Sequence, residues 1–242
     1  MPIFDAHFHI IDPRFPLVAN QGFLPEPFTV SDYRLRTSEL DITGGAVVSG
    51  SFQAYDQTYL IDALEQLGPD FVGVANVPPD ITDDEVLTLY AAGVRAFRVN
   101  LYRGGDLDLL ELAPRFAELV GWHLEVYVDV RDLPELAPRL LRVPRLVIDH
   151  LGMSQAGLPA LLELVKEGAY VKASGFGRID LDVPAALRAI ADVNPGALLF
   201  GSDLPSTRAK RSFQDTDIQL VREIAGARAL HANAFAIYAG VT

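Results

Sequence analysis

The sequence predicts an α/β protein, a single-domain (β/α)8 TIM barrel, from three observations. Short apolar runs alternate with helix-like stretches eight times in 242 residues, which is the order of strands and helices in that fold. The runs are apolar almost throughout, as in a parallel sheet covered on both faces. An open doubly wound sheet, the main alternative, is expected to have a glycine-rich phosphate loop after an early strand, and no dinucleotide-binding motif or P-loop is present. We therefore expect one barrel domain over residues 1–242.

The predicted strands are β-branched or apolar runs, each closed by polar residues, glycine or proline. In chain order they are Ile3–His9, Gly45–Phe52, Phe71–Val77, Val94–Leu101, Leu124–Val130, Arg145–His150, Ala169–Ser174 and Leu198–Asp203. The connection from Ile11 to Ser31, after the first strand, is long and contains four prolines. We expect it to form a loop over the barrel mouth.

The predicted helices lie between these strands and after the last one. They are Tyr59–Leu67, Thr82–Ala92, Leu109–Val120, Leu133–Leu141, Leu158–Lys166, Pro184–Ala191, Asp217–Ile224 and Ala229–Tyr238. Thr82 and Glu85 have the spacing of a capping box, in which each side chain bonds the backbone N–H of the other residue. Glycines stand where a left-handed helix end is expected, at Gly68, Gly93, Gly121 and Gly168.

Composition indicates an ordinary globular protein, because half of the residues are hydrophobic and 21% are charged. The absence of cysteine excludes disulfides, thiolate zinc sites and a cysteine nucleophile. The first residues lack the basic and apolar regions of a signal peptide, and no apolar run approaches the ~18 residues of a membrane span. We therefore expect a cytoplasmic protein.

The charge balance argues against nucleic acid or an anionic membrane as a partner. The chain has 20 basic and 32 acidic residues, which gives a formal charge of −12. A small anionic ligand remains compatible with this charge, since the basic residues, 17 of them arginines, can gather in one pocket. The sequence leaves the oligomeric state open.

Reactive side chains follow three predicted strands, at the barrel end where active sites lie. The first strand ends in His7 and His9, and a period of two is expected to point both, together with Asp5, towards the barrel axis. His150 follows the sixth strand and Asp203 the eighth. Each residue alone has an ordinary structural interpretation, as a hydrogen-bonded imidazole or a helix cap. Their coincidence at three strand ends predicts an active site.

The other two histidines have structural interpretations. His123 precedes the fifth strand, at the opposite rim of the barrel, and His231 lies in the last helical stretch.

Basic residues also collect after the strands, which predicts a substrate with one or more carboxylates, because guanidinium groups bind carboxylates through paired hydrogen bonds. We expect Arg98 and Arg178 to contact the ligand, in preference to Arg208, Lys210 and Arg211. Tyr127, on the fifth strand, has two interpretations: its hydroxyl faces the mouth or its ring packs in the core. The full set of candidate cations is Arg98, Arg103, Arg131, Lys172, Arg178, Arg208, Lys210 and Arg211.

The ordered motifs resemble the amidohydrolase superfamily, and within it the amidohydrolase-2 branch that includes 2-pyrone-4,6-dicarboxylate lactonases. The resemblance implies hydrolysis with Asp203 as the proton-transfer group. It rests on Asp5-Ala6-His7-Phe8-His9, Gly121-Trp122-His123, Asp149-His150-Leu151-Gly152, Lys172-Ala173-Ser174-Gly175, Gly201-Ser202-Asp203-Leu204-Pro205 and Asn233-Ala234.

The resemblance also implies substrate-binding residues. Arginines after strand four, a tyrosine on strand five and an arginine after strand seven correspond to Arg98, Arg103, Tyr127 and Arg178. A serine on strand two corresponds to Ser49 or Ser51, and the spacing does not decide between them. The chain lacks a convincing tyrosine in the first loop and is short for the branch, which argues against an identical substrate.

The same comparison argues against a required metal. Metal-dependent members use a histidine on strand five and often a lysine or glutamate on strand four, and this chain offers Tyr127 and Val94–Asn100 instead. We therefore expect no cofactor. Zinc or manganese is the alternative, bound by His7, His9, Asp203 and His150.

The sequence thus predicts a hydrolase that opens a carboxylated lactone or related cyclic ester. Asp203 is the expected general base and acid, and His7, His9 and His150 are expected to polarise the carbonyl. The alternatives are a metal-dependent hydrolase or decarboxylase of the same superfamily, a non-catalytic barrel that binds a carboxylated metabolite, and a purely structural barrel. The convergence of polar residues argues against the last.

Overall fold

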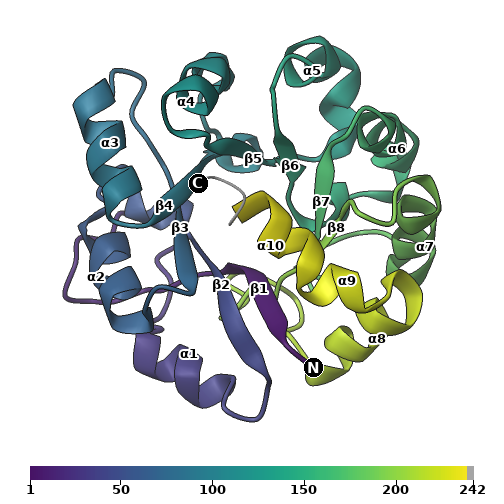
Figure 1. The fold of residues 1–242 in the computed structure, drawn as a ribbon, viewed down its shortest axis with the longest axis horizontal. Helices are drawn as coiled ribbons and strands as arrows, with labels where there is room; N and C mark the ends of the chain where they lie inside the picture. The colour runs from purple at the N-terminus through teal and green to yellow at the C-terminus, as the bar shows by residue number, and fades with distance from the viewer. Residues whose placement is uncertain (239–242) are drawn as a thin grey trace.

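The computed structural model describes residues 1–238, and positions 239–242 of the expected domain lie outside the described residues. Eight strands form one sheet in chain order, and each strand is parallel to the next (Figure 1). They are β1 (Ile3–Phe8), β2 (Ile42–Val48), β3 (Phe71–Ala75), β4 (Val94–Asn100), β5 (His123–Tyr127), β6 (Leu146–Ile148), β7 (Tyr170–Ala173) and β8 (Leu198–Phe200).

Backbone hydrogen bonds just beyond β8 join it to β1 and close the ring. The Asp203 N–H donates to the His7 carbonyl at 2.7 Å, and the His9 N–H donates to the Leu204 carbonyl at 2.8 Å. The predicted (β/α)8 barrel is therefore confirmed.

Helices surround the strands (Figure 1). They are α1 (Val30–Arg36), α2 (Thr58–Leu67), α3 (Asp83–Ala91), α4 (Ala113–Val120), α5 (Leu133–Leu140), α6 (Leu158–Lys166), α7 (Val183–Val193), α8 (Asp215–Ala225), α9 (Ala227–Leu230) and α10 (Ala232–Tyr238). The capping box of Thr82 and Glu85 is present at the start of α3. Within residues 1–238, none of the helices has the length and apolar character needed to cross a bilayer.

Three elements differ from the prediction. The second strand begins and ends earlier than expected, since a 3-10 turn at Ser51–Gln53 ends the extended chain. Its first half contains Gly44 and Gly45, where an added Cβ would lie 2.5 Å and 2.7 Å from backbone carbonyl oxygens, so these glycines allow close packing and do not break the strand. Helix α1 was not predicted, since the expected loop ended at Ser31 and the first expected helix began at Tyr59. The last expected helix is divided at His231 into α9 and α10.

The protein has two apolar cores, and their positions determine which end of the barrel is open. The larger one lies between the strands and the outer helices. The smaller one fills the barrel interior and includes Phe4, Ala6 and Val48 together with Ile237 and Tyr238 of α10. Helix α10 lies across the N-terminal end of the strands (Figure 1), so the carboxyl ends remain available for a site.

Candidate active site

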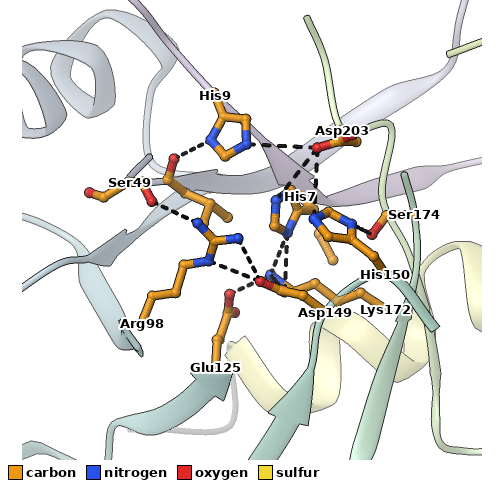
Figure 2. A network of polar contacts seen from close by, with 12 residues as sticks. His7, His9, Ser49, Arg98, Glu125, Asp149, His150, Lys172, Ser174 and Asp203 are labelled. Carbon is orange, nitrogen blue, oxygen red and sulfur yellow. Dashed lines mark hydrogen bonds and ion pairs between the residues drawn. The ribbon is translucent and has the colours of Figure 1, made fainter. Parts of the chain in front are cut away.

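The four predicted catalytic residues lie together at the carboxyl ends of the strands, as Figure 2 shows. The Nε2 atoms of three imidazoles face one carboxylate oxygen, Asp203 Oδ1. They lie 3.8 Å (His7), 3.7 Å (His9) and 4.0 Å (His150) from it. All four residues are buried. Because these separations exceed a hydrogen bond, the imidazoles and the carboxylate surround a point that a reacting atom can occupy.

Asp5 does not point with the two histidines of β1, so that expectation is wrong. A register irregularity between Asp5 and Phe8 interrupts the alternation of the strand. The Asp5 carboxylate accepts hydrogen bonds from the Ser202 N–H (2.7 Å), the Ser202 hydroxyl (2.6 Å) and the Tyr33 hydroxyl of α1 (3.1 Å). Its contact with His7 is to the backbone N–H, and so Asp5 joins β1 to β8 and does not set an imidazole tautomer.

Tight loops after β6 and β8 present His150 and Asp203. Both residues have left-handed backbone conformations, with φ of 52° for His150 and 58° for Asp203, which residues other than glycine rarely adopt. Gly175, after β7, has a φ of 63°, and a Cβ there would lie 2.6 Å from His150 Nδ1. Strained residues of this kind are typical of functional sites.

The imidazoles of His7 and His150 are in their neutral form. Burial lowers the pKa of His150 to about 3. Burial, with the nearby Lys172 ammonium, holds the pKa of His7 well below its usual value. His9 Nδ1 lies 2.7 Å from the Val48 carbonyl, which can only accept, so Nδ1 is protonated and donates this hydrogen bond.

Asp203 is ionised. Burial alone would raise its pKa, but the nearby positive charge, chiefly the Arg178 guanidinium, holds the pKa below its usual range. Arg178 donates from Nε (2.8 Å) and Nη2 (2.5 Å) to the same oxygen, Oδ2. Oδ1 has no hydrogen-bond partner among the described residues and faces the imidazoles.

His7, His9 and Asp203 can hold a metal ion, since their ligand atoms lie within 4.8 Å of one another. A second set, His7, Asp149 and His150, meets the same criterion. His7 Nε2 and Asp203 Oδ1 are both buried without a hydrogen-bond partner in the described part of the chain. Neutral imidazole and ionised carboxylate are the forms that bind metals, so these residues fit a divalent ion.

A cavity lies directly above this cluster, and four arginines line it. Arg103 and Arg208 form no ion pair with a carboxylate in residues 1–238, and burial together with Arg103 lowers the pKa of Arg208. Arg178 is paired with Asp203, as described above. The other lining residues are His9, Gly50, Ser51, Phe52, Arg98, Asn100, Tyr127, His150 and Thr207.

Arg98 reaches the cavity wall but is engaged in the protein. Its Nε and Nη2 lie 2.9 Å and 2.8 Å from Asp149 Oδ2, and its Nη1 donates to the Ser49 carbonyl at 3.1 Å. Of the two serines, only Ser51 lines the cavity, because the Ser49 hydroxyl is bonded to Gln57 (2.8 Å) and Tyr59 (2.7 Å).

The remaining predicted residues lie away from the cavity. Arg131 pairs with Asp129, Arg211 pairs with Asp217, and Lys210 is exposed. His123 is the first residue of β5, where it contacts Glu125 at 3.2 Å, and His231 stacks on Phe235, so both are structural as expected.

Sequence reasoning missed two features. It ranked Arg208 below Arg98, although Arg98 is paired with Asp149 and Arg208 pairs with no carboxylate of the described residues, because the fold of the loop after β8 could not be foreseen. It also treated Lys172 as a mouth residue, whereas Lys172 is wholly buried beneath His7 beside Glu125. A signal existed: Glu125 and Lys172 each stand inside an apolar strand, where a charge requires a partner.

Solved structures share this fold. A probable 2-pyrone-4,6-dicarboxylic acid hydrolase from Acinetobacter baumannii, solved with citric acid bound, has a TM-score of 0.83 and 22% identity over 99% of this chain and 100% of that chain. A protein from Agrobacterium tumefaciens has a TM-score of 0.87 and 23% identity over 98% of this chain and 95% of that chain.

Curated relatives match at the sequence level. A 2-pyrone-4,6-dicarboxylate hydrolase of Comamonas testosteroni is 28% identical over 87% of this chain and 79% of its own length. A 4-sulfomuconolactone hydrolase of Hydrogenophaga intermedia is 26% identical over 88% of this chain and 79% of its own length. The amidohydrolase family model matches residues 4–239. With the barrel and the clustered histidines and aspartate in place, this match shows that the chain belongs to the amidohydrolase family.

Proposed function

We propose that the protein is a hydrolase that opens a carboxylated lactone or related cyclic ester by attack of water. The observation that carries the proposal is the position of Asp203 Oδ1, which has no hydrogen-bond partner in residues 1–238, faces three imidazoles and lies beneath a cavity lined by arginines. Such a site combines a proton acceptor, groups that stabilise an oxyanion and cations that bind an acidic substrate. The two curated relatives, whose names denote lactone substrates with acidic groups, support this class.

In the proposed reaction, Asp203 accepts a proton from water as the water attacks the lactone carbonyl. The protonated Asp203 then delivers that proton to the leaving ring oxygen. His7 and His150 stabilise the negative charge that develops on the carbonyl oxygen, while His9 helps to hold the water. The products are the two ends of the opened ring, a hydroxyl group and a carboxylic acid, which releases its proton to solvent at neutral pH.

Arg178 connects substrate binding to the base. In the free protein its guanidinium holds Asp203 Oδ2 and makes Asp203 a weak base. A substrate carboxylate in the cavity attracts Arg178, which weakens that pair and raises the proton affinity of Asp203. Arg103, Arg208, Tyr127 and Ser51 form the rest of the proposed binding surface.

We propose that turnover needs no metal ion. β4 offers no lysine or glutamate ligand, β5 ends in Tyr127, and the carboxylate of Asp203 is already neutralised by Arg178. A metal ion, if bound, would be held by His7, His9 and Asp203, with His150 as a fourth ligand, and would polarise the carbonyl as a Lewis acid. That convergence of ligand atoms favours a metal-dependent hydrolase or decarboxylase as the second candidate function.

A screen of carboxylated lactones tests both candidates. Ring opening is measured with protein before and after EDTA treatment, and metal content is verified in each sample. We expect turnover to survive removal of the metal. Loss of turnover that stoichiometric zinc or manganese restores would replace this proposal with the metal-dependent one. A lactone that stabilises the protein yet is recovered unchanged would indicate a binding protein.

A further inference from the structure

Charged side chains form a buried network directly beneath the catalytic cluster (Figure 2). Lys172 of β7 and Glu125 of β5 are wholly buried, as is Asp149 after β6. Lys172 Nζ lies 2.5 Å from Glu125 Oε2, 3.2 Å from His7 Nδ1 and 3.7 Å from Asp149 Oδ1. None of these three residues lines the cavity, so they act on the site only through other residues.

The network makes two competing contacts with one atom, His7 Nδ1. Lys172 Nζ lies 3.2 Å from it, and Asp149 Oδ1 lies 3.3 Å from it. A ring nitrogen of neutral imidazole has either a proton or a lone pair, and it can therefore satisfy only one of these partners. An ammonium group only donates, so bonding to Lys172 places the imidazole proton on Nε2. Bonding to Asp149 would place it on Nδ1.

The geometry favours Lys172. Its contact with Nδ1 has hydrogen-bond geometry, whereas Asp149 Oδ1 has no hydrogen-bond partner in the described part of the chain. Asp149 is engaged by Arg98 at its other oxygen, Oδ2, at 2.9 Å and 2.8 Å. Glu125 keeps the Lys172 ammonium in place with one oxygen, while its other oxygen bonds Tyr238 and contacts His123.

We propose that Lys172, held by Glu125, is a positioning residue that fixes His7 in the tautomer protonated at Nε2. The two histidines of β1 then differ in role. His7 presents an N–H to the reacting centre, while the neutral form of His9, whose Nδ1 donates to the Val48 carbonyl, presents a lone pair. In the proposed hydrolysis, His7 is a hydrogen-bond donor to the oxyanion and His9 is an acceptor for the water. This division of roles rests on the proposed function, but the tautomer itself does not.

The tautomer is measured without a substrate. Long-range ¹H–¹⁵N correlation spectra of protein labelled at its five histidines report which ring nitrogen is protonated, and the His7 signals are identified by their loss in His7→Gln. We expect His7 to be protonated at Nε2 near neutral pH. A proton at Nδ1 in the unaltered protein would overturn the proposal.

A charge-balanced variant tests the cause. Lys172→Met combined with Glu125→Gln removes both charges and leaves no uncompensated buried ion. We expect the His7 proton to move to Nδ1, where Asp149 accepts it, and the matched surface variant Lys166→Met to leave the spectrum unchanged. An unchanged tautomer in the folded double variant would contradict the proposal. If the double variant does not fold, the spectrum of the unaltered protein still decides.

Kinetics with a substrate from the lactone screen separate positioning from a merely structural role. Loss of one oxyanion donor typically lowers kcat by about 10²-fold, and we expect the double variant to lose about this much with little change in KM. A rise in KM with kcat preserved would show that Lys172 supports substrate binding and would refute its proposed role. Failure of the unaltered protein to open any lactone would refute the proposed function and leave the tautomer assignment intact.

Discussion

The two oxygens of Asp203 face different groups, Arg178 on one side and the imidazoles on the other, and the second oxygen is the proposed proton acceptor. Oδ2 accepts two hydrogen bonds from Arg178, and Oδ1 faces the imidazoles with no hydrogen-bond partner in the part of the chain that the structure describes. Replacing Asp203 with Asn removes the proton acceptor while keeping the shape of the side chain. We expect kcat to fall by about 10²- to 10⁴-fold with a much smaller change in KM, measured by steady-state kinetics on a carboxylated lactone.

The matched control for Asp203→Asn is Asp83→Asn. Asp83 also pairs with an arginine, Arg115, but on the protein surface. Its loss should leave kcat unchanged. Near-normal turnover in Asp203→Asn would exclude this residue as the base.

Arg103 and Arg208 line the cavity, and no carboxylate of the described chain neutralises either charge, although Arg208 also donates to the Asn20 carbonyl. Both charges can therefore attract a substrate anion. Replacing either with Met should raise KM about tenfold or more for a carboxylated substrate and change kcat little, because the bond is equally strong before and during reaction. Initial rates over a range of substrate concentrations measure both constants. Arg222→Met, an exposed site on α8, is the control, and equal KM values in all three variants would disprove an anion site here.

Sequence alone predicted that His7, His9, His150 and Asp203 come together, because each stands at a strand end, where barrel topology makes distant residues meet. It misplaced Asp5, since a period of two holds only while the strand is regular. Which polar groups bond one another also depends on loop conformations and side-chain orientations that local patterns do not encode.

At the scale of elements, the loop after β7 rests against the loop after β8. The Lys210 N–H donates to the Gly177 carbonyl at 2.9 Å, and a Cβ on Gly177 would lie 1.8 Å from the Arg211 carbonyl oxygen. Gly177→Ala must therefore separate the loops, and it should destabilise the protein by about 1–3 kcal/mol. Because Arg178 is the next residue, kcat/KM should fall as well.

Chemical denaturation and initial rates measure the two effects of Gly177→Ala. Gly196→Ala is the comparison, since the nearest atom to its added Cβ is a side-chain oxygen at 3.2 Å. Equal stability of the two variants would show that the two loops are not in firm contact.

The eight strands were predictable because buried parallel strands are uniformly apolar, and their order follows from the chain. Helix α1 was not predictable in the same way. Its capping box pairs Thr29 with Asp32 at the end of a proline-rich connection, and prolines favour a loop prediction. The helix is stabilised by a distant contact, the stacking of Tyr33 on Phe8, which the local sequence does not reveal. The second strand was predicted to begin at Gly45, and its first three residues, which include Gly44, were missed; both glycines allow close contact with neighbouring backbone.

At the scale of the whole molecule, the buried histidines predict a loss of stability in acid. Burial lowers the pKa of His7, His123 and His150, the last to about 3. As the pH falls below about 6.5, the unfolded chain takes up protons that the folded protein excludes, so the free energy of unfolding should decrease by up to about 1.4 kcal/mol per pH unit for each histidine. Asp5, whose pKa burial raises to about 6, acts in the opposite direction and offsets part of this loss.

Urea denaturation at pH values from 7 to 4 measures this dependence. The slope should flatten in His150→Gln and stay unchanged in His231→Gln, which alters a histidine outside the barrel interior. Stability that holds constant or rises between pH 6.5 and 5 would contradict the prediction.

Helix α10 is synthesised after all eight strands, so its packing against the barrel is a late step of folding during translation. Ile237 and Tyr238 fill the interior end of the barrel, and the side-chain amide of Asn233 donates to backbone carbonyls at the start of β8. The ribosome makes these residues after all eight strands, so a nascent chain that has just completed β8 still has an unfilled interior and Glu125 without its Tyr238 bond. Exposed apolar surface at that stage favours binding by chaperones, and the emergence of α10 removes it.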